Sequence, residues 1–261
     1  MVLQSFQVDA FTDRIFSGNP AVVVMLEEKL PDSVLRKIAQ ENYVPETAFI
    51  LPDGNNYSLR WFTPDMEMDL CGHATLASAH VLFTWYKYKE EEILFNTASG
   101  QIAVKKDGDM ISMDFPLREA IKSPLPEEIY DSLNIKPLEI YKARDYLLVY
   151  ARQEEIEMIE IERSVFDEIN IDPGGVIVTA PGKECDFVSR YFTPQATIHE
   201  DPVTGSAHCT LAPYWAKRLK KDSLKARQLS KRGGAITCIM EEERVLIKGS
   251  AVIFSKSELY L

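Results

Sequence analysis

The side chains best suited to chemistry gather in two short segments. All four histidines lie within residues 65–80 and 193–209. Each segment leads into a predicted helix, which begins at Gly72-His73 in the first segment and at Gly205-Ser206 in the second. The free N–H groups and the partial positive charge of a helix N-terminus bind carboxylates and phosphates. In a two-fold arrangement, both helix starts are predicted to face one cleft.

Structural roles compete with chemical ones at several positions. Ser206 is suited to an N-cap, and Asp201, one turn before the second helix, is suited to partner the helix dipole. His80 and His208 are better suited to core or capping positions. Glu46 starts an apolar strand, where a surface position is the ordinary interpretation. That strand leads towards the first helix, however, so Glu46 is predicted to project over the cleft.

Metal and nucleotide sites are disfavoured by spacing. Cys71-x-His73, and the set His199, Asp201, His208 and Cys209, are ligand types, but their spacing fits no common zinc pattern. Gly233-Gly234 is an isolated pair without the spacing of a phosphate loop or dinucleotide fingerprint, and no Gly-x-Ser-x-Gly motif occurs. We therefore predict no metal site.

The elements that must position these residues are short strands mixed with helices. Apolar periodicity and turn residues predict strands over 2–8, 19–26, 47–51, 57–62, 146–150, 176–179 and 187–192. They predict helices over 31–41, 72–88, 156–169 and 206–221, the second of them buried and the third acidic. An Asp-Gly turn predicts a hairpin between 102–104 and 111–115.

The two parts of the chain repeat one another. Arg60-Trp-Phe-Thr-Pro64 matches Arg190-Tyr-Phe-Thr-Pro194, and the spacing from Ala48 to Phe62 equals that from Val178 to Phe192. Such recurrence indicates a duplication. We predict two similar α+β halves, each a sheet wrapped around a central helix. The proline-rich segment after residue 115 is the predicted junction, which gives halves 1–117 and 118–261. A return of the last strand to the first half is the alternative left open.

Composition and charge limit the class of protein. With 261 residues, 46% hydrophobic and 26% charged, the chain is typical of globular proteins and long enough for two domains. A net charge of −11 argues against nucleic-acid and anionic-membrane partners. The longest apolar run, 21–26, is far shorter than the ~20 residues of a membrane helix. Without a secretory signal at residues 1–10 or any Cys-x-x-Cys pair, we expect a cytoplasmic protein with reduced thiols.

A set of motifs extends along nearly the whole chain. They are Val8-Asp-Ala-Phe-Thr, Phe16-Ser-Gly-Asn-Pro-Ala21, Glu46-Thr-Ala-Phe, Phe62-Thr-Pro with Asp69-Leu-Cys-Gly-His-Ala-Thr75, and Glu200-Asp-Pro-Val-Thr-Gly-Ser-Ala207. Together they resemble the phenazine biosynthesis (PhzF-like) isomerase family, which has a diaminopimelate-epimerase-like fold. The resemblance implies two pseudo-symmetric halves, each a curved, mainly antiparallel sheet or barrel around a central helix, with the active site in the cleft between them.

The resemblance also implies an activity and a set of site residues. The implied activity is a cofactor-independent isomerisation that moves a proton between carbon atoms of a small carboxylic acid, in a homodimer. Glu46 is implied as the acid/base, and Gly72 and Gly205 as N–H donors to the substrate carboxylate. The full implied set is, as catalytic groups, Glu46, His73 and Asp201 and, as substrate-binding groups, Ser206, Gly72, Gly205, Asn19 and Cys71.

One departure from the wider fold leaves alternatives open. Two-thiol epimerases and racemases place a cysteine before the glycine of each helix start, whereas this chain has Cys71 before Gly72 but Thr204 before Gly205. A two-thiol racemase is therefore not expected, and Cys71 is also suited to be a small buried residue. The alternatives are a one-thiol epimerase or dehydratase that uses Cys71 with Thr204, and a non-catalytic protein that binds a small carboxylate or a protein partner.

Overall fold

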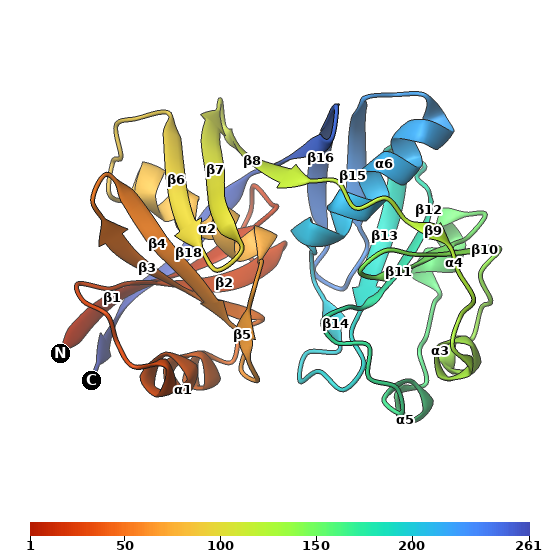
Figure 1. Cartoon of the computed structure of the whole chain (residues 1–261), viewed down its shortest axis with the longest axis horizontal. Helices are drawn as coiled ribbons and strands as arrows, with labels where there is room; N and C mark the ends of the chain where they lie inside the picture. The colour runs from red at the N-terminus through yellow and green to blue at the C-terminus, as the bar shows by residue number, and fades with distance from the viewer. The chain divides into compact units, whose positions relative to one another are not determined.

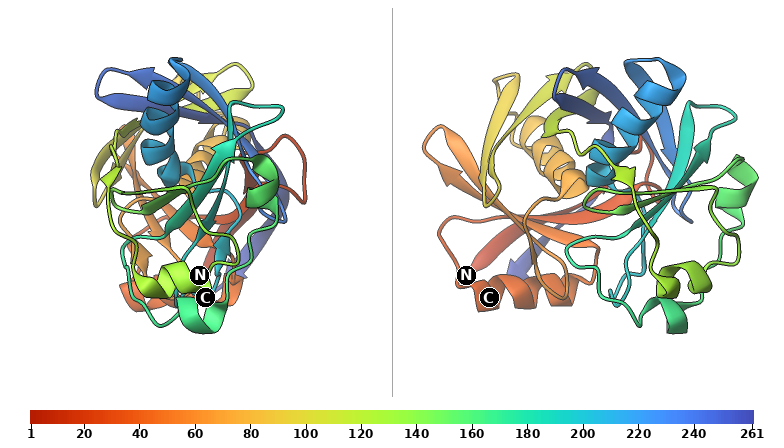
Figure 2. Two further views of the ribbon diagram at one scale, coloured as in Figure 1. Left: turned by 90° about the vertical axis from the view of Figure 1, so that its right-hand side faces the viewer. Right: turned by 45° about the vertical axis from the view of Figure 1, so that its right-hand side comes forward.

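The computed structural model describes residues 1–261 and divides into two compact units (Figure 1). The first unit comprises Met1–Phe115 and Leu246–Leu261, and the second comprises Pro116–Val245. Residues 246–261 therefore pack with the first unit. The sequence-based division placed them with the second half and left open the return of the last strand to the first half, which is the arrangement found. The cause is strand pairing, because β18 (Ala251–Tyr260) lies antiparallel to β1 (Val2–Ala10). The two termini consequently lie side by side (Figure 2).

The first unit consists of strands arranged around a buried helix. Neighbouring strands pair in antiparallel fashion, except that β2 pairs with β3 and β4 with β6 in parallel. Besides β1 and β18, its elements are β2 (Asn19–Met25), α1 (Asp32–Asn42), β3 (Glu46–Asp53), β4 (Asn56–Phe62), β5 (Glu67–Met68), α2 (Gly72–Thr84), β6 (Glu92–Thr97), β7 (Gly100–Asp107) and β8 (Met110–Pro116).

Helix α2 is the centre of the first unit. Nearly all of its residues are buried, and it packs against β1, β2, β3 and β18 (Figure 1). Its buried hydroxyls bond within the helix, where Thr75 donates to the Cys71 carbonyl and Ser78 to the Ala74 carbonyl. These bonds remove the cost of burying an unpaired hydroxyl. The helix ends at Thr84, about one turn before the predicted end at residue 88.

The second unit repeats this strand order. Its elements are β9 (Ile121–Lys122), α3 (Glu127–Ser132), β10 (Glu139–Lys142), β11 (Tyr146–Val149), α4 (Gln153–Glu157), α5 (Arg163–Phe166), β12 (Val176–Pro181), β13 (Phe187–Phe192), β14 (Glu200–Asp201), the 3₁₀ turn η1 (Gly205–Ala207), α6 (His208–Leu219), β15 (Ser223–Gln228) and β16 (Gly234–Glu241). β17 (Arg244–Gly249) leads the chain back to the first unit. None of the helices is long and apolar enough to cross a membrane.

Strand pairing confirms the predicted pair of similar α+β halves. The parallel pairs β2–β3 and β4–β6 correspond to β11–β12 and β13–β15, with antiparallel pairs at matching places between them. The register differs by one residue from the predicted spacing. Ala48 lies opposite Trp61, and the residue opposite the matching Tyr191 is Ile177 rather than Val178.

The predicted acidic helix over 156–169 is wrong, because two short helices, α4 and α5, occupy this region. The side chain of Arg190 donates to the carbonyl oxygens of Ile156 and Ile159, at 3.1 and 2.8 Å. Glu162 then caps a new helix by accepting from the N–H of Ser164. Because a distant arginine binds these carbonyls, apolar periodicity alone did not reveal the interruption.

Candidate active site

Glu46 and His73 form a buried acid–imidazole pair in the first unit. Glu46 is the first residue of β3, and His73 is the second residue of α2. The Glu46 Oε2 and His73 Nε2 atoms lie 3.0 Å apart, with side chains 14% and 3% exposed. Neither atom has a regular hydrogen-bond partner, so this contact is what compensates their burial.

Asn19 orients the imidazole from the opposite side. It is the first residue of β2 and is fully buried, and its Nδ2 lies 3.0 Å from Nδ1 of His73. The Asn19 amide faces Nδ1 of the imidazole, and Nε2 of the same ring faces Glu46. The structure therefore brings together three of the residues predicted for the site, from the starts of two strands and a helix.

The charges of this cluster depend on burial. Burial by itself lowers the pKa of His73, but the Cys71 sulfur and the Glu46 carboxylate outweigh it and raise the pKa of the imidazole. Burial, and then the Glu46 carboxylate, raises the pKa of the Cys71 thiol to about 11. The thiol is therefore protonated at neutral pH, and a protonated thiol is a poor nucleophile.

Glu46, Cys71 and His73 are all metal-ligand types, with ligand atoms within 4.8 Å of one another. Glu46 and Cys71, however, contact opposite nitrogens of the His73 imidazole. The Cys71 sulfur lies 3.6 Å from Nδ1, whereas the Glu46 oxygen lies 3.0 Å from Nε2. The lone pairs of the two ring nitrogens point away from each other, so one ion held by His73 does not meet both other groups. The cluster does not have the arrangement of a single-metal site.

The start of α2 adds backbone donors beside this cluster. Cys71 is the N-cap residue in an extended conformation, and no side chain caps the helix. The N–H groups of Gly72 and His73 have no acceptor within the helix, as is general for the first turn. Donors of this kind stabilise negative charge.

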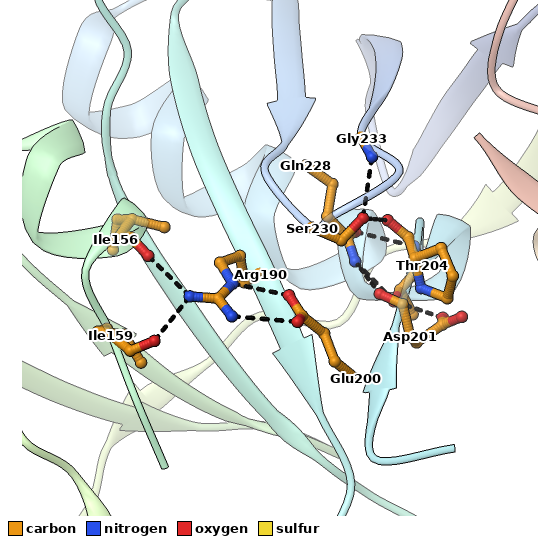
Figure 3. A network of polar contacts seen from close by, with 10 residues as sticks. Ile156, Ile159, Arg190, Glu200, Asp201, Thr204, Gln228, Ser230 and Gly233 are labelled. Atoms are coloured by element: carbon orange, nitrogen blue, oxygen red, sulfur yellow. Dashed lines mark hydrogen bonds and ion pairs between the residues drawn. The ribbon is translucent and has the colours of Figure 1, made fainter. Parts of the chain in front are cut away.

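In the second unit, Asp201 lies on the two-residue strand β14, which is held from both ends (Figure 3). On one side, the Arg190 guanidinium donates to both carboxylate oxygens of Glu200, at 2.7 and 3.0 Å. On the other side, the Ser230 hydroxyl donates to the Pro202 carbonyl at 2.7 Å. These bonds fix the backbone on either side of Asp201.

The helix start of the second unit follows directly. Thr204, buried, donates its hydroxyl to Asp201 Oδ2 at 2.5 Å. His208 Nδ1 contacts the Thr204 carbonyl at 2.9 Å, and burial lowers the pKa of His208 to about 4, so this histidine is a neutral capping group. Gly205 is buried and Ser206 is half-buried, both in η1. Asp201, Gly205 and Ser206 are thus near neighbours along one turn.

The repeat shows which positions differ between the units. Arg60 donates two hydrogen bonds to the carboxylate of Glu67, as Arg190 does to that of Glu200. Counting from these glutamates, the second unit has aspartate, threonine, glycine and serine where the first has methionine, cysteine, glycine and histidine. The matched pairs are Met68 with Asp201, Cys71 with Thr204, Gly72 with Gly205 and His73 with Ser206. The three additional residues of the second loop lie before Glu200.

In the second unit, the space that corresponds to the Glu46 side chain is occupied by another residue. Strand pairing matches Glu46 with Gly175, the residue before β12. A Cβ atom on Gly175 would lie 2.5 Å from the ring and hydroxyl of Tyr191. Tyr191 is itself held by a 2.9 Å bond from its hydroxyl to buried Asp145, which also accepts from the Gly175 N–H. A tyrosine ring occupies the space where a second acidic side chain would begin.

Sequence reasoning missed Gln228, which is buried at the end of β15 and binds both Asp201 and Thr204. The alternation of β15 predicts an inward side chain at this position, but the hydrogen-bond partners of that side chain come from a distant turn.

The eight predicted site residues fall into two groups within separate units. The first unit holds Asn19, Glu46, Cys71, Gly72 and His73, and the second holds Asp201, Gly205 and Ser206. Their joint action on one substrate stays a prediction.

Comparison with known proteins identifies the family. The model of the phenazine biosynthesis-like protein family matches residues 8–257. An uncharacterized isomerase of Pseudomonas aeruginosa is 45% identical, over 100% of both chains. A PhzF family crystal structure from Enterococcus faecalis is 46% identical over 100% of both chains, with a TM-score of 0.94. A hydroxyproline epimerase from Agrobacterium vitis, 11% identical, shares the fold with a TM-score of 0.64 over 99% of this chain and 92% of its own. The chain therefore belongs to the phenazine biosynthesis-like (PhzF) family.

Proposed function

We propose that this chain is an isomerase that moves a proton between two carbon atoms of a small carboxylic acid without a cofactor, and that Glu46 carries the proton. The observation that carries the proposal is the buried contact of Glu46 with His73 at 3.0 Å, beside the first turn of α2. A carbon acid needs a base at the departing proton and donors where negative charge develops. Glu46 supplies the base, and the N–H groups of Gly72 and His73 are suited to stabilise the charge.

The difference between the units supports one acid/base group rather than two. Inversion by two bases needs a proton carrier on each face of the substrate, but Gly175 stands where Glu46 stands in the first unit. A single carboxylate that removes a proton also returns it on the same face. A shift of the proton to a second carbon on that face suits this arrangement better than racemisation.

Asp201 and Ser206 are proposed to bind and orient the substrate. Asp201 is held by its neighbours in one orientation, and Ser206 stands where the first unit has His73. We propose that both act on the same substrate molecule as Glu46. An experimental structure with a bound carboxylic acid tests this, because the ligand must contact groups from both units; a ligand that contacts Glu46 alone would contradict it.

The test of the reaction is solvent exchange in deuterated water. A panel of small cyclic and unsaturated carboxylic acids is incubated with the protein and examined by mass spectrometry. We expect a compound that binds to incorporate deuterium or to rearrange. The rate of this reaction is expected to fall by about 10²–10⁴-fold in Glu46→Gln. Glu41→Gln, which alters an exposed glutamate of α1, is the matched control and keeps its activity. If compounds bind but none exchanges or rearranges, the protein is a non-catalytic binder.

A thiol mechanism makes the opposite prediction. It needs Cys71 as a thiolate, whereas burial raises the pKa of that thiol to about 11. It also needs Thr204 as the second group, whereas the Thr204 hydroxyl is bonded to Asp201. If Cys71→Ala is inactive and Glu46→Gln is active, the one-thiol epimerase or dehydratase replaces the proposal.

A further inference from the structure

Gln228 is a fully buried amide that closes the turn carrying Asp201 (Figure 3). It is 1% exposed at the end of β15. Its Oε1 accepts from the Thr204 N–H at 2.8 Å, and its Nε2 donates to the Asp201 carbonyl at 2.7 Å. One side chain therefore holds both ends of the turn between β14 and the helix start.

The same amide sets the direction of the Thr204 hydroxyl. Gln228 Nε2 lies 3.3 Å from Thr204 Oγ1, and a primary amide nitrogen can only donate. The hydroxyl accepts there and gives its own proton to Asp201 Oδ2, 2.5 Å away. The bonds form a relay from amide to hydroxyl to carboxylate, in which each donor strengthens the next.

Comparison of the two units shows that the fold of this turn does not require the relay. Ser99 in the first unit donates to the Asp69 carbonyl at 2.8 Å, as Ser230 donates to the Pro202 carbonyl. This serine clamp is common to both units. The relay is not, because the first unit has methionine and cysteine at the positions of Asp201 and Thr204. The first unit thus builds the same turn without it.

We propose that Thr204 and Gln228 are positioning residues that hold the Asp201 carboxylate in one orientation and favour its ionised form. The inference rests on the proposed function, because it assigns Asp201 its part in it. Asp201 is then a fixed acceptor that orients the substrate, and Glu46 alone carries the proton. A hydroxyl that donates to a carboxylate favours the ionised form.

The test follows the carboxyl carbon of Asp201 by NMR through an acid titration, with aspartate labelled by carbon-13. The signal is assigned by its loss in Asp201→Asn. We expect the titration midpoint in Thr204→Val to lie about one pH unit above that of the unmodified protein. Thr204→Ser keeps the hydroxyl and restores the midpoint. Gln228→Met, which removes the amide, moves it in the same direction as Thr204→Val.

Ser230→Ala is the matched control, because it removes the shared serine clamp but leaves the relay intact. It is expected to lower the melting temperature without moving the midpoint. An unchanged midpoint in Thr204→Val, or an equal movement in Ser230→Ala, overturns the proposal even if Gln228→Met does not fold. The titration needs no substrate, so its outcome is separate from that of the exchange assay. Where exchange is found, Thr204→Val lowers kcat and Thr204→Ser recovers it.

Discussion

Replacing Glu46 by glutamine is expected to change stability in a pH-dependent way. At pH 6 the protonated imidazole of His73 faces the Glu46 carboxylate at 3.0 Å. Two unit charges about 4 Å apart attract by about 4 kcal/mol at an effective dielectric of about 20. Burial of both groups offsets part of this, and a glutamine oxygen still accepts a neutral hydrogen bond of about 0.5–1.5 kcal/mol. We therefore expect Glu46→Gln to lower the free energy of unfolding by about 1–2 kcal/mol at pH 6.

The sign of the pH dependence follows from His73. Its folded-state pKa is raised above the ordinary value of 6.5 in spite of burial. Below the Cys71 pKa of about 11 that thiol is uncharged, so in this range the Glu46 carboxylate is the charge that raises the pKa of His73. The stabilisation that the His73–Glu46 ion pair gives the folded protein is present in full below the unfolded-state pKa of His73. It is lost as the pH rises through the folded-state pKa of His73. The difference in stability between the unmodified protein and Glu46→Gln should therefore shrink as the pH rises from 6 through the folded-state pKa of His73.

Thermal unfolding followed by circular dichroism measures this effect. At about 2–4 °C per kcal/mol for a chain of this size, the melting temperature of Glu46→Gln should be about 2–8 °C lower at pH 6. It should be closer to that of the unmodified protein once the pH exceeds the folded-state pKa of His73. Glu41→Gln removes an exposed carboxylate and should show no such trend. The imidazole of His73 should also titrate at lower pH in Glu46→Gln. A difference in melting temperature that stays constant with pH would refute the ion-pair reasoning.

Three further predictions concern the thiols, Gly175 and the assembly. Iodoacetamide at pH 7.5 should modify half-buried Cys185 before Cys71, as peptide mass spectrometry can measure; rapid modification of Cys71 would favour the thiol alternative. Gly175→Ala should destabilise the protein by about 1–3 kcal/mol in denaturant unfolding, since its Cβ meets Tyr191 at 2.5 Å, and unchanged stability would show that the ring can move aside. Light scattering should give twice the chain mass of 29.7 kDa for the expected homodimer, and the monomer mass would contradict it.

The sequence was informative wherever local pattern determines structure. The match between Arg60-Trp-Phe-Thr-Pro64 and Arg190-Tyr-Phe-Thr-Pro194 predicted two similar halves, and both arginines make the same fork with a glutamate. The start of the first central helix at Gly72 was also predicted, and the predicted start at Gly205-Ser206 is the 3₁₀ turn that leads into α6. These features depend on residues close together along the chain.

What the sequence left open depends on contacts between distant residues. Asn19 on β2 contacts His73 on α2, and Gln228 at the end of β15 contacts the turn at Thr204. No local pattern marks an asparagine or a glutamine as the partner of a distant imidazole or hydroxyl. The protonation of Cys71 likewise follows from burial, which is a property of the folded chain.

The repeat also explains how two similar units can carry different candidate site residues. Each unit supplies a helix start with glycine at the same place, which suits both units to bind negative charge. The side chains around the two starts then diverge, to Glu46 with His73 in the first unit and to Asp201 with Thr204 in the second. Because Tyr191 fills the second unit where a counterpart of Glu46 would begin, restoring symmetry requires more than one substitution. Gly175→Glu alone would force an acidic side chain against the ring of Tyr191, so a second acidic group at this position is not available by a single mutation.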